Sequence, residues 1–92
     1  LGRHAGVLVA AANHNTLIGA AAGDNITSGS GNIMIGSAVD AASATDDVQL
    51  KITGYDGTTT TTWVSGDSAG DITLAGTSGS DVNLGADIGL TF

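Results

Sequence analysis

An internal repeat constrains this chain more than any other feature. The segment Asn15-Thr-Leu-Ile-Gly19 recurs 17 residues later as Asn32-Ile-Met-Ile-Gly36. Between the copies lie many Gly, Asn, Asp and Ser residues, which favour tight turns because Gly adopts positive φ and the polar side chains hydrogen-bond to nearby backbone. Each copy holds too few apolar residues to bury a core alone. The repeat therefore predicts short strands that stack on one another or on another chain.

Period-two alternation predicts further strands downstream. In Val48–Thr53, the residues Val48, Leu50 and Ile52 share one face and the polar residues share the other. Similar short alternations occur in 71–76, 81–85 and 87–92. At the other end, the apolar run Val7–Ala11 resembles the core of a signal peptide, but we favour its assignment as a first strand.

The middle of the chain predicts a β-hairpin over 51–64. Tyr55-Asp56-Gly57 is its turn, since Asp-Gly is a strong hairpin signal, and the Thr run ending in Trp63 is the returning strand. A second turn is expected at 66–70. A lone Trp in a small β module usually anchors the core, so we interpret Trp63 in this way. The alternative is that Trp63 and Tyr55 stack on a sugar ring.

The predicted fold is all-β, either a short-rung parallel β-solenoid or an interwound trimeric β-fibre, followed by a β-hairpin module. We place the repeat-like segment at 1–44 and the hairpin and short-strand module at 45–92, with 37–47 as the junction. Residues 38–47 are expected to be a loop or a single helical turn, because Ala favours helix while the Ser, Thr and Asp residues weaken it.

Composition excludes several function classes. The net charge is −7 with only two Lys and Arg residues, which disfavours binding to nucleic acid or to an anionic membrane surface. No apolar run approaches the roughly 20 residues that span a bilayer. The chain has no Cys, so neither a disulfide scaffold nor a thiolate zinc site is available.

Composition also indicates that the chain needs neighbours. Aromatic residues make up 3% of the sequence and much of its apolar content is Ala, which buries little area. Gly raises the entropy cost of ordering, and no disulfide compensates. We therefore expect an oligomer, either three chains wrapped together or subunits stacked in a filament.

Catalytic and metal-binding patterns are incomplete. The two imidazoles, His4 and His14, are expected at surface or turn positions, and Ser30 does not lie in a Gly-x-Ser-x-Gly elbow that leads into a helix. We predict no enzyme activity and no cofactor. Calcium needs six to eight oxygen ligands, and no complete calcium loop occurs. The weak metal candidates are Asp67, Asp71 and Asp81.

The segment from Asn15 to Gly36 resembles repeats in tail fibre and appendage proteins of marine bacteriophages. Those repeats read approximately Asn-Thr-x-Ile-Gly, Ala-Gly-Asp and Ile-Thr-x-Gly-Ser-x-Asn-x-x-Ile-Gly, and with the following segment the resemblance covers roughly 15–76. The Asn-x-x-Ile-Gly element is more loosely similar to head repeats of trimeric autotransporter adhesins of the YadA type. The resemblance implies an elongated homotrimeric β-fibre with a structural or receptor-facing role and no catalytic residues.

We therefore expect a structural segment of an extracellular fibre, most plainly a phage appendage, that forms a homotrimer or filament and contacts a host glycan or protein. The alternatives are a bacterial or archaeal filament or adhesin subunit, joined by strand addition at an edge, and a calcium- or carbohydrate-binding β module. In the fibre, the apolar strand faces pack at the axis. The predicted assembly core is Ile18, Ile33, Ile35, Leu50 and Ile52.

Overall fold

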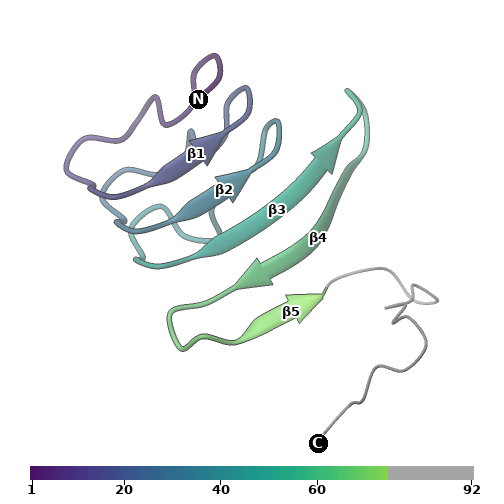
Figure 1. The fold of residues 1–92 in the computed structure, drawn as a ribbon. Coiled ribbons are helices and arrows are strands. Elements are labelled where there is room, and N and C mark those ends of the chain that lie inside the picture. Colours follow the sequence, from purple (N-terminus) through teal and green to yellow (C-terminus); the bar gives the residue numbers. More distant parts are fainter. Residues whose placement is uncertain (75–92) are drawn as a thin grey trace, which may run out of the picture.

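Five strands form one mixed sheet in the order β1-β2-β3-β4-β5 (Figure 1). The computed structural model describes residues 1–74, and this part of the chain is all-β without a helix, so it holds no helix that could cross a membrane. Adjacent strands pair parallel from β1 to β3 and antiparallel from β3 to β5. The strands are β1 (Thr16–Ile18), β2 (Ile33–Ile35), β3 (Leu50–Tyr55), β4 (Thr60–Gly66) and β5 (Ile72–Leu74).

The register of the first three strands repeats the 17-residue spacing of the sequence. Thr16 pairs with Ile33, and Ile33 pairs with Leu50. The start of β3 is therefore a third copy of the repeat. The sequence motif hides this copy, because Gln49 stands where the earlier copies have Asn and Thr53 stands where they have Gly. We call residues 15–31 and 32–48 the two windings.

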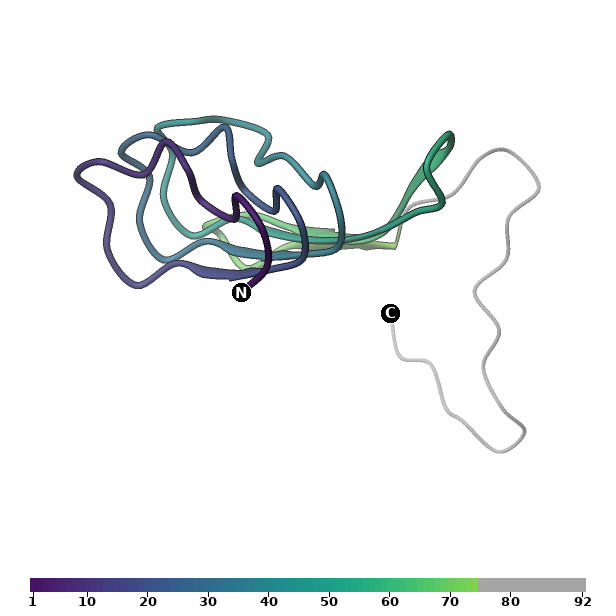
Figure 2. The same cartoon turned by 90° about the horizontal axis from the view of Figure 1, so that it is seen from above.

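The windings lie on one side of the sheet and stack on one another (Figure 2). Backbone hydrogen bonds join positions one winding apart: the amide of Ala10 donates to the carbonyl of Thr27, at 3.1 Å, and the amide of Thr27 donates to that of Ala44, at 2.9 Å. These loop bonds continue the sheet ladder around the winding. Loop backbone that would otherwise need water is thereby satisfied by the next winding.

A ladder of side-chain amides also connects the windings. Asn15 Oδ1 accepts from the backbone amide of Asn32 at 2.8 Å, and Asn32 Oδ1 accepts from that of Gln49 at 2.7 Å. Asn32 Nδ2 donates to the carbonyl of Asp46 at 3.3 Å. The Asn32 side chain is fully buried. The recurring Asn therefore aligns each winding with the next from inside the fold.

Glycine is required where successive windings touch at the end of each strand. Gly19 and Gly36 have φ values of 129° and 136°. A Cβ atom on Gly36 would lie 2.0 Å from the carbonyl oxygen of Thr53, and one on Gly19 would lie 2.2 Å from that of Gly36. Backbone atoms cannot give way as a flexible side chain can, so the Gly of the motif is fixed by close approach as well as by φ.

The interior of the windings is small. The partly buried Val9, Ala12 and Leu17 pack against its buried apolar residues. Leu17 of β1 and Met34 of β2 are the strand residues that face this interior, because strand side chains alternate between faces. The buried apolar residues are Ala22, Ile26, Met34, Val39 and Ala41.

The expected hairpin forms from β3 and β4 and extends beyond the windings as an arm (Figures 1 and 2). The pairing register shifts between Ile52 and Thr53, and such a bulge bends a strand. Beyond this point the arm curves toward the side of the sheet that carries the windings (Figure 2). At its tip, amides of Thr59 and Thr58 donate to Asp56 and hold the pKa of this carboxyl below its usual range.

Several expectations about the strands and turns are confirmed, and one expected strand is absent. The repeat strands, the 51–64 hairpin and the 66–70 turn are present, and 38–47 is a loop without a helical turn. Val7–Ala11 is not a strand. It is part of the loops that cover the inner side of the sheet, where Val9 packs against the interior and the amide of Ala10 donates to the carbonyl of Thr27. Of 71–76, β5 forms over Ile72–Leu74. The expected strands at 81–85 and 87–92 lie outside the described residues.

The Asn ladder yields a stability prediction. Asn32→Ala leaves the buried amide of Gln49 without its acceptor, so we expect the free energy of unfolding to fall by about 1–3 kcal/mol. Asn13→Ala is the matched control, because the hydrogen bonds of the exposed Asn13 use its backbone: its amide donates to Ser30 Oγ and its carbonyl accepts from the amide of Gly31. Urea denaturation measures both variants. Equal losses would show that the ladder does not align the windings.

The two kinds of positive-φ glycine yield a second prediction. Gly57 has φ 102° but nothing within 4 Å of an added Cβ, whereas Gly36 faces Thr53 backbone. Gly57→Ala is expected to cost about 1–2 kcal/mol of conformational strain, and Gly36→Ala is expected to cost more, because the contact with the next strand must open. Thermal unfolding compares them. A smaller loss at Gly36 than at Gly57 would contradict the close approach.

Candidate assembly face

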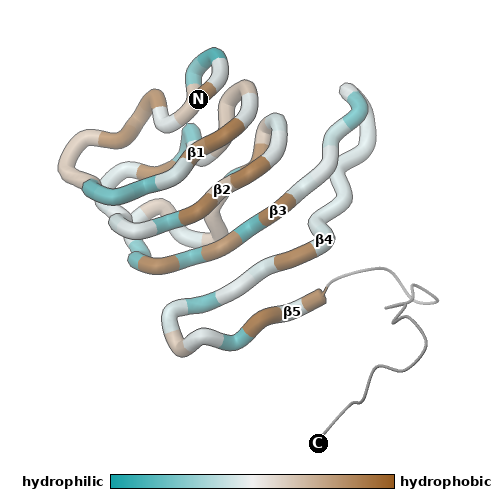
Figure 3. Tube along the Cα trace, viewed as in Figure 1, coloured by the Kyte–Doolittle hydropathy of each residue, from teal (hydrophilic) through white to brown (hydrophobic). Residues whose placement is uncertain are grey.

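The face of the sheet that points away from the windings is apolar across all five strands. Its residues form two rows of directly paired positions, which follow from the strand registers. Paired residues share a face. Figure 3 shows the apolar positions recurring from strand to strand. One row is Ile18, Ile35, Ile52, Val64 and Leu74, and the other is Thr16, Ile33, Leu50, Gly66 and Ile72.

We call these two rows the outer face. Its apolar side chains are accessible in the single chain: Ile18 is 42% exposed, Ile33 is 40% exposed and Ile72 is 58% exposed. Ile35, Leu50 and Ile52 are half-buried by their neighbours along the rows. Monomeric proteins rarely leave a contiguous apolar patch of this kind facing water.

The sequence of each repeat strand explains why both faces are apolar. In Ile33-Met-Ile35 the central Met points into the winding, so both flanking Ile residues point outward. Strands that are apolar on both faces are typical of sheets covered on both sides. Here the windings cover one side of β1 and β2 only.

The opposite face of β3–β5 is polar, and Thr53 of β3 is buried on it. Lys51, Ser65 and Thr73 are paired across the three strands and share this face. Thr53 and Thr62 bond to each other through their hydroxyls at 3.1 Å. Lys51 Nζ donates to the carbonyl of Asp40 at 3.0 Å, at the open end of the last winding. The β3–β5 part of the sheet is therefore amphipathic, with its apolar side outward.

The acidic residues of the described part of the chain lie in loops and turns, and none of them lies in a strand. On neighbouring windings, partial burial and the adjacent Asp24 carboxyl raise the pKa of Asp40, while Lys51 lowers it. The outer face itself carries no ionisable side chain. Two copies brought together through this face would therefore not place like charges in direct contact.

The five predicted core residues all lie on the outer face. Ile18, Ile33 and Ile35 occupy β1 and β2, and Leu50 and Ile52 occupy β3. They are not part of the chain's own interior, which is formed by residues such as Ile26 and Met34. Their role in assembly stays a prediction. Sequence reasoning missed Val64, Ile72 and Leu74, whose place on the same face depends on the antiparallel register and on the bulge.

The other candidate residues are dispersed. Oδ1 of Asp67 accepts from the amides of Ala69 and Asp71, which shapes the β4–β5 turn. No group of three or more His or Asp side chains that could hold a metal ion occurs within residues 1–74. Asp81 lies outside the described residues. His4 and His14 are exposed turn residues with φ 62°, as expected.

The interpretation of Trp63 as a core anchor is wrong, because its side chain is 55% exposed. The indole lies over Gly54 on the hairpin arm, where an added Cβ would approach its ring to 2.4 Å. The buried apolar cluster lies inside the windings. The hairpin arm extends beyond the windings, so Trp63 does not pack against this cluster.

Comparisons with known proteins give no relative. No family model matches the sequence, and neither a curated protein nor a solved structure matches it.

The Asp24–Asp40 pair yields a prediction of pH dependence. The pKa of Asp40 is raised in the folded state, so the folded protein holds this proton more tightly than the unfolded chain does. The resulting contribution to the free energy of unfolding is complete below the unfolded pKa of about 3.8 and is lost as the pH rises through the folded pKa. Asp40→Asn is therefore expected to raise the melting temperature at pH 7, with the gain disappearing at pH 3. Thr45→Asn, an exposed loop change, is the control. A gain that does not depend on pH would contradict this account.

Proposed function

We propose that this chain is a structural segment of an extracellular fibre and that it assembles as a homotrimer through its outer face. The observation that carries the proposal is the direction of the two apolar rows. They run across the strands, which is the direction in which the windings stack. Copies that bury these rows against one another lie side by side along their length, as the chains of a fibre do.

In this proposal the windings and β3 are a short-rung parallel β-solenoid, and β3–β5 are the hairpin module that follows it. The interior of the windings is narrow, and within the described residues it is filled by Ala side chains with Ile26, Met34 and Val39, without an aromatic side chain. The second apolar layer comes from the partner copies. The Ile and Leu rows of three chains form a common core around the fibre axis, while the loops and their Asp residues face water and keep the assembly soluble.

A second copy of the chain fits the outer face better than an unrelated partner. The face offers aliphatic side chains with a Thr and a Gly at single positions, so it has no charged group that a partner would need to match. Rows of Ile and Leu complement themselves when related by symmetry. The resemblance of 15–36 to repeats of marine phage tail fibres supports the same arrangement, with three chains and a host-facing role.

The alternative hypothesis, a bacterial or archaeal filament joined by strand addition, receives less support from the structure. Subunits joined by strand addition need a donor strand, and the segment considered for this role, Val7–Ala11, is part of the loop side and packs against the interior through Val9. A bacterial or archaeal adhesin built on side-by-side chains would use the same outer face. It therefore differs from a phage appendage in origin rather than in mechanism.

Charge placed on the outer face tests the proposal. Ile35→Asp is expected to convert the trimer to monomer, because the carboxylate would be buried against apolar side chains at a cost of several kcal/mol. Ile33→Asp, at a more exposed position of the single chain, is expected to do the same while disturbing the winding less. Light scattering measures the mass, and circular dichroism verifies that the β fold is retained.

Ser28→Asp is the matched control, since Ser28 is an exposed loop residue that does not belong to the outer face. It adds the same charge and is expected to leave the trimer intact. A wild-type chain with the monomer mass of 8.9 kDa at micromolar concentration would overturn the proposal. A stable dimer would overturn the trimeric arrangement.

A further inference from the structure

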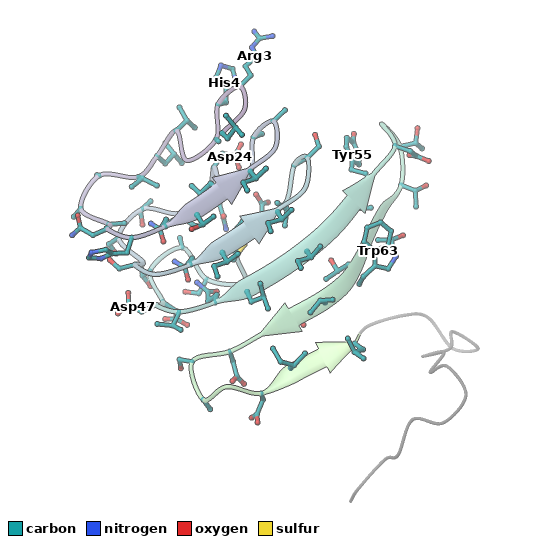
Figure 4. The ribbon with its side chains drawn as sticks, viewed as in Figure 1. Arg3, His4, Asp24, Asp47, Tyr55 and Trp63 are labelled. Atoms are coloured by element: carbon teal, nitrogen blue, oxygen red, sulfur yellow. The ribbon has the colours of Figure 1, made fainter. Side chains whose placement is uncertain are left out.

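A shallow groove at the hairpin tip gathers the two aromatic residues of the arm with polar side chains. The groove has a volume of about 280 Å³. Tyr55 and Trp63 both project from the arm (Figure 4) and are 43% and 55% exposed. The residues that line the groove are Gly54, Tyr55, Asp56, Thr59, Thr61 and Trp63.

Local contacts hold this groove in shape. The Tyr55 hydroxyl donates to the carbonyl of Gly57 at 3.0 Å, which fixes the phenol ring over the turn. Asp56 Oδ1 accepts from the amides of Thr58 and Thr59 at 2.9 and 2.8 Å, so its carboxylate is also fixed. The indole of Trp63 lies against Gly54, where the absence of a side chain lets it lie close to the backbone. Fixed rings and a fixed acceptor reduce the entropy cost of binding.

We propose that this groove binds a neutral saccharide, with the indole of Trp63 stacked on the apolar CH face of a sugar ring. Hydroxyls of the sugar are donors to the Asp56 carboxylate and partners of the Thr59 and Thr61 hydroxyls. No Lys or Arg lines the groove, and the chain carries a net charge of −7, so anionic sugars and phosphorylated ligands are disfavoured. The combination of an exposed ring with hydroxyl and carboxylate groups fits a neutral polyhydroxylated ligand.

The groove is compatible with assembly through the outer face. The arm curves away from the plane of the outer face beyond the bulge at Ile52 and Thr53 (Figure 2), and none of the residues that line the groove belongs to the two rows of the outer face. The inference therefore does not rest on the proposed function. A monomer could bind the saccharide, and a trimer would present three such tips, which raises avidity for a surface that carries repeated sugars.

Tryptophan fluorescence of the full chain tests the proposal directly, because Trp63 is the single Trp of the sequence. The probes are maltohexaose, cellohexaose and mannohexaose, with polygalacturonate as the anionic comparison. We expect at least one neutral probe to change the emission in a saturable manner and polygalacturonate to leave it unchanged. A flat response to all three neutral probes would overturn the proposal, as would saturation by polygalacturonate alone.

Variants locate the binding to the groove. Calorimetry with the responding probe is expected to show an affinity loss of about tenfold or more for Trp63→Ala, the loss typical of removing a stacking ring, and retained binding for Trp63→Phe. Leu8→Ala, an exposed apolar change in the N-terminal loop that lies outside both the groove and the outer face, is the control and is expected to bind normally. Light scattering of Trp63→Ala separates the two proposals: lost binding with unchanged mass supports the groove. A change to monomer would assign Trp63 to the assembly face instead.

Discussion

The fold depends on the fixed spacing of 17 residues between pairing strands. This spacing places Thr16, Ile33 and Leu50 in one row. It also lets the side-chain oxygens of Asn15 and Asn32 accept from the backbone amides of Asn32 and Gln49, respectively. Insertion of one residue in a winding would move the amide ladder away from its acceptors and turn the strand face over. Strands of only three residues remain ordered because each loop is hydrogen-bonded to the next as well.

The same spacing aligns large apolar side chains on the outer face, and the single chain leaves them exposed to water. Ile33 and Ile35 of β2 point outward on either side of the inward Met34, and Ile18 of β1 and Leu50 and Ile52 of β3 also point outward. The outer face therefore carries more large aliphatic side chains than the interior does. Across β3–β5 the opposite face is polar, with Lys51, Ser65 and Thr73 in one row. The hydrophobic effect therefore acts on the outer face. Homotrimeric assembly, as we propose it, removes that face from water and leaves the Asp-bearing loops outside.

Much of this architecture was predictable from the sequence, and the misses have physical reasons. The repeat located β1 and β2, alternation located β3, and Asp56-Gly57 located the hairpin turn. The pattern could not show that Leu50–Ile52 is a third copy, since Gln49 and Thr53 stand where the earlier copies have the recurring Asn and Gly. The prediction for Trp63 was wrong because the general tendency of Trp to be buried does not indicate that its strand extends beyond the core. The bulge, which decides the face of Trp63 and Val64, has no signature in the residue types.

The most direct test of the central claim is the accessibility of the outer face in the intact protein. The chain contains no Cys, so a single thiol introduced at a chosen site reports on that site alone. The account predicts that Ile35→Cys is labelled slowly by a maleimide at micromolar protein concentration, whereas Ser28→Cys on the exposed loop is labelled at the rate of an unfolded control. Labelling of Ile35→Cys as fast as Ser28→Cys, with the β fold retained, would contradict the account.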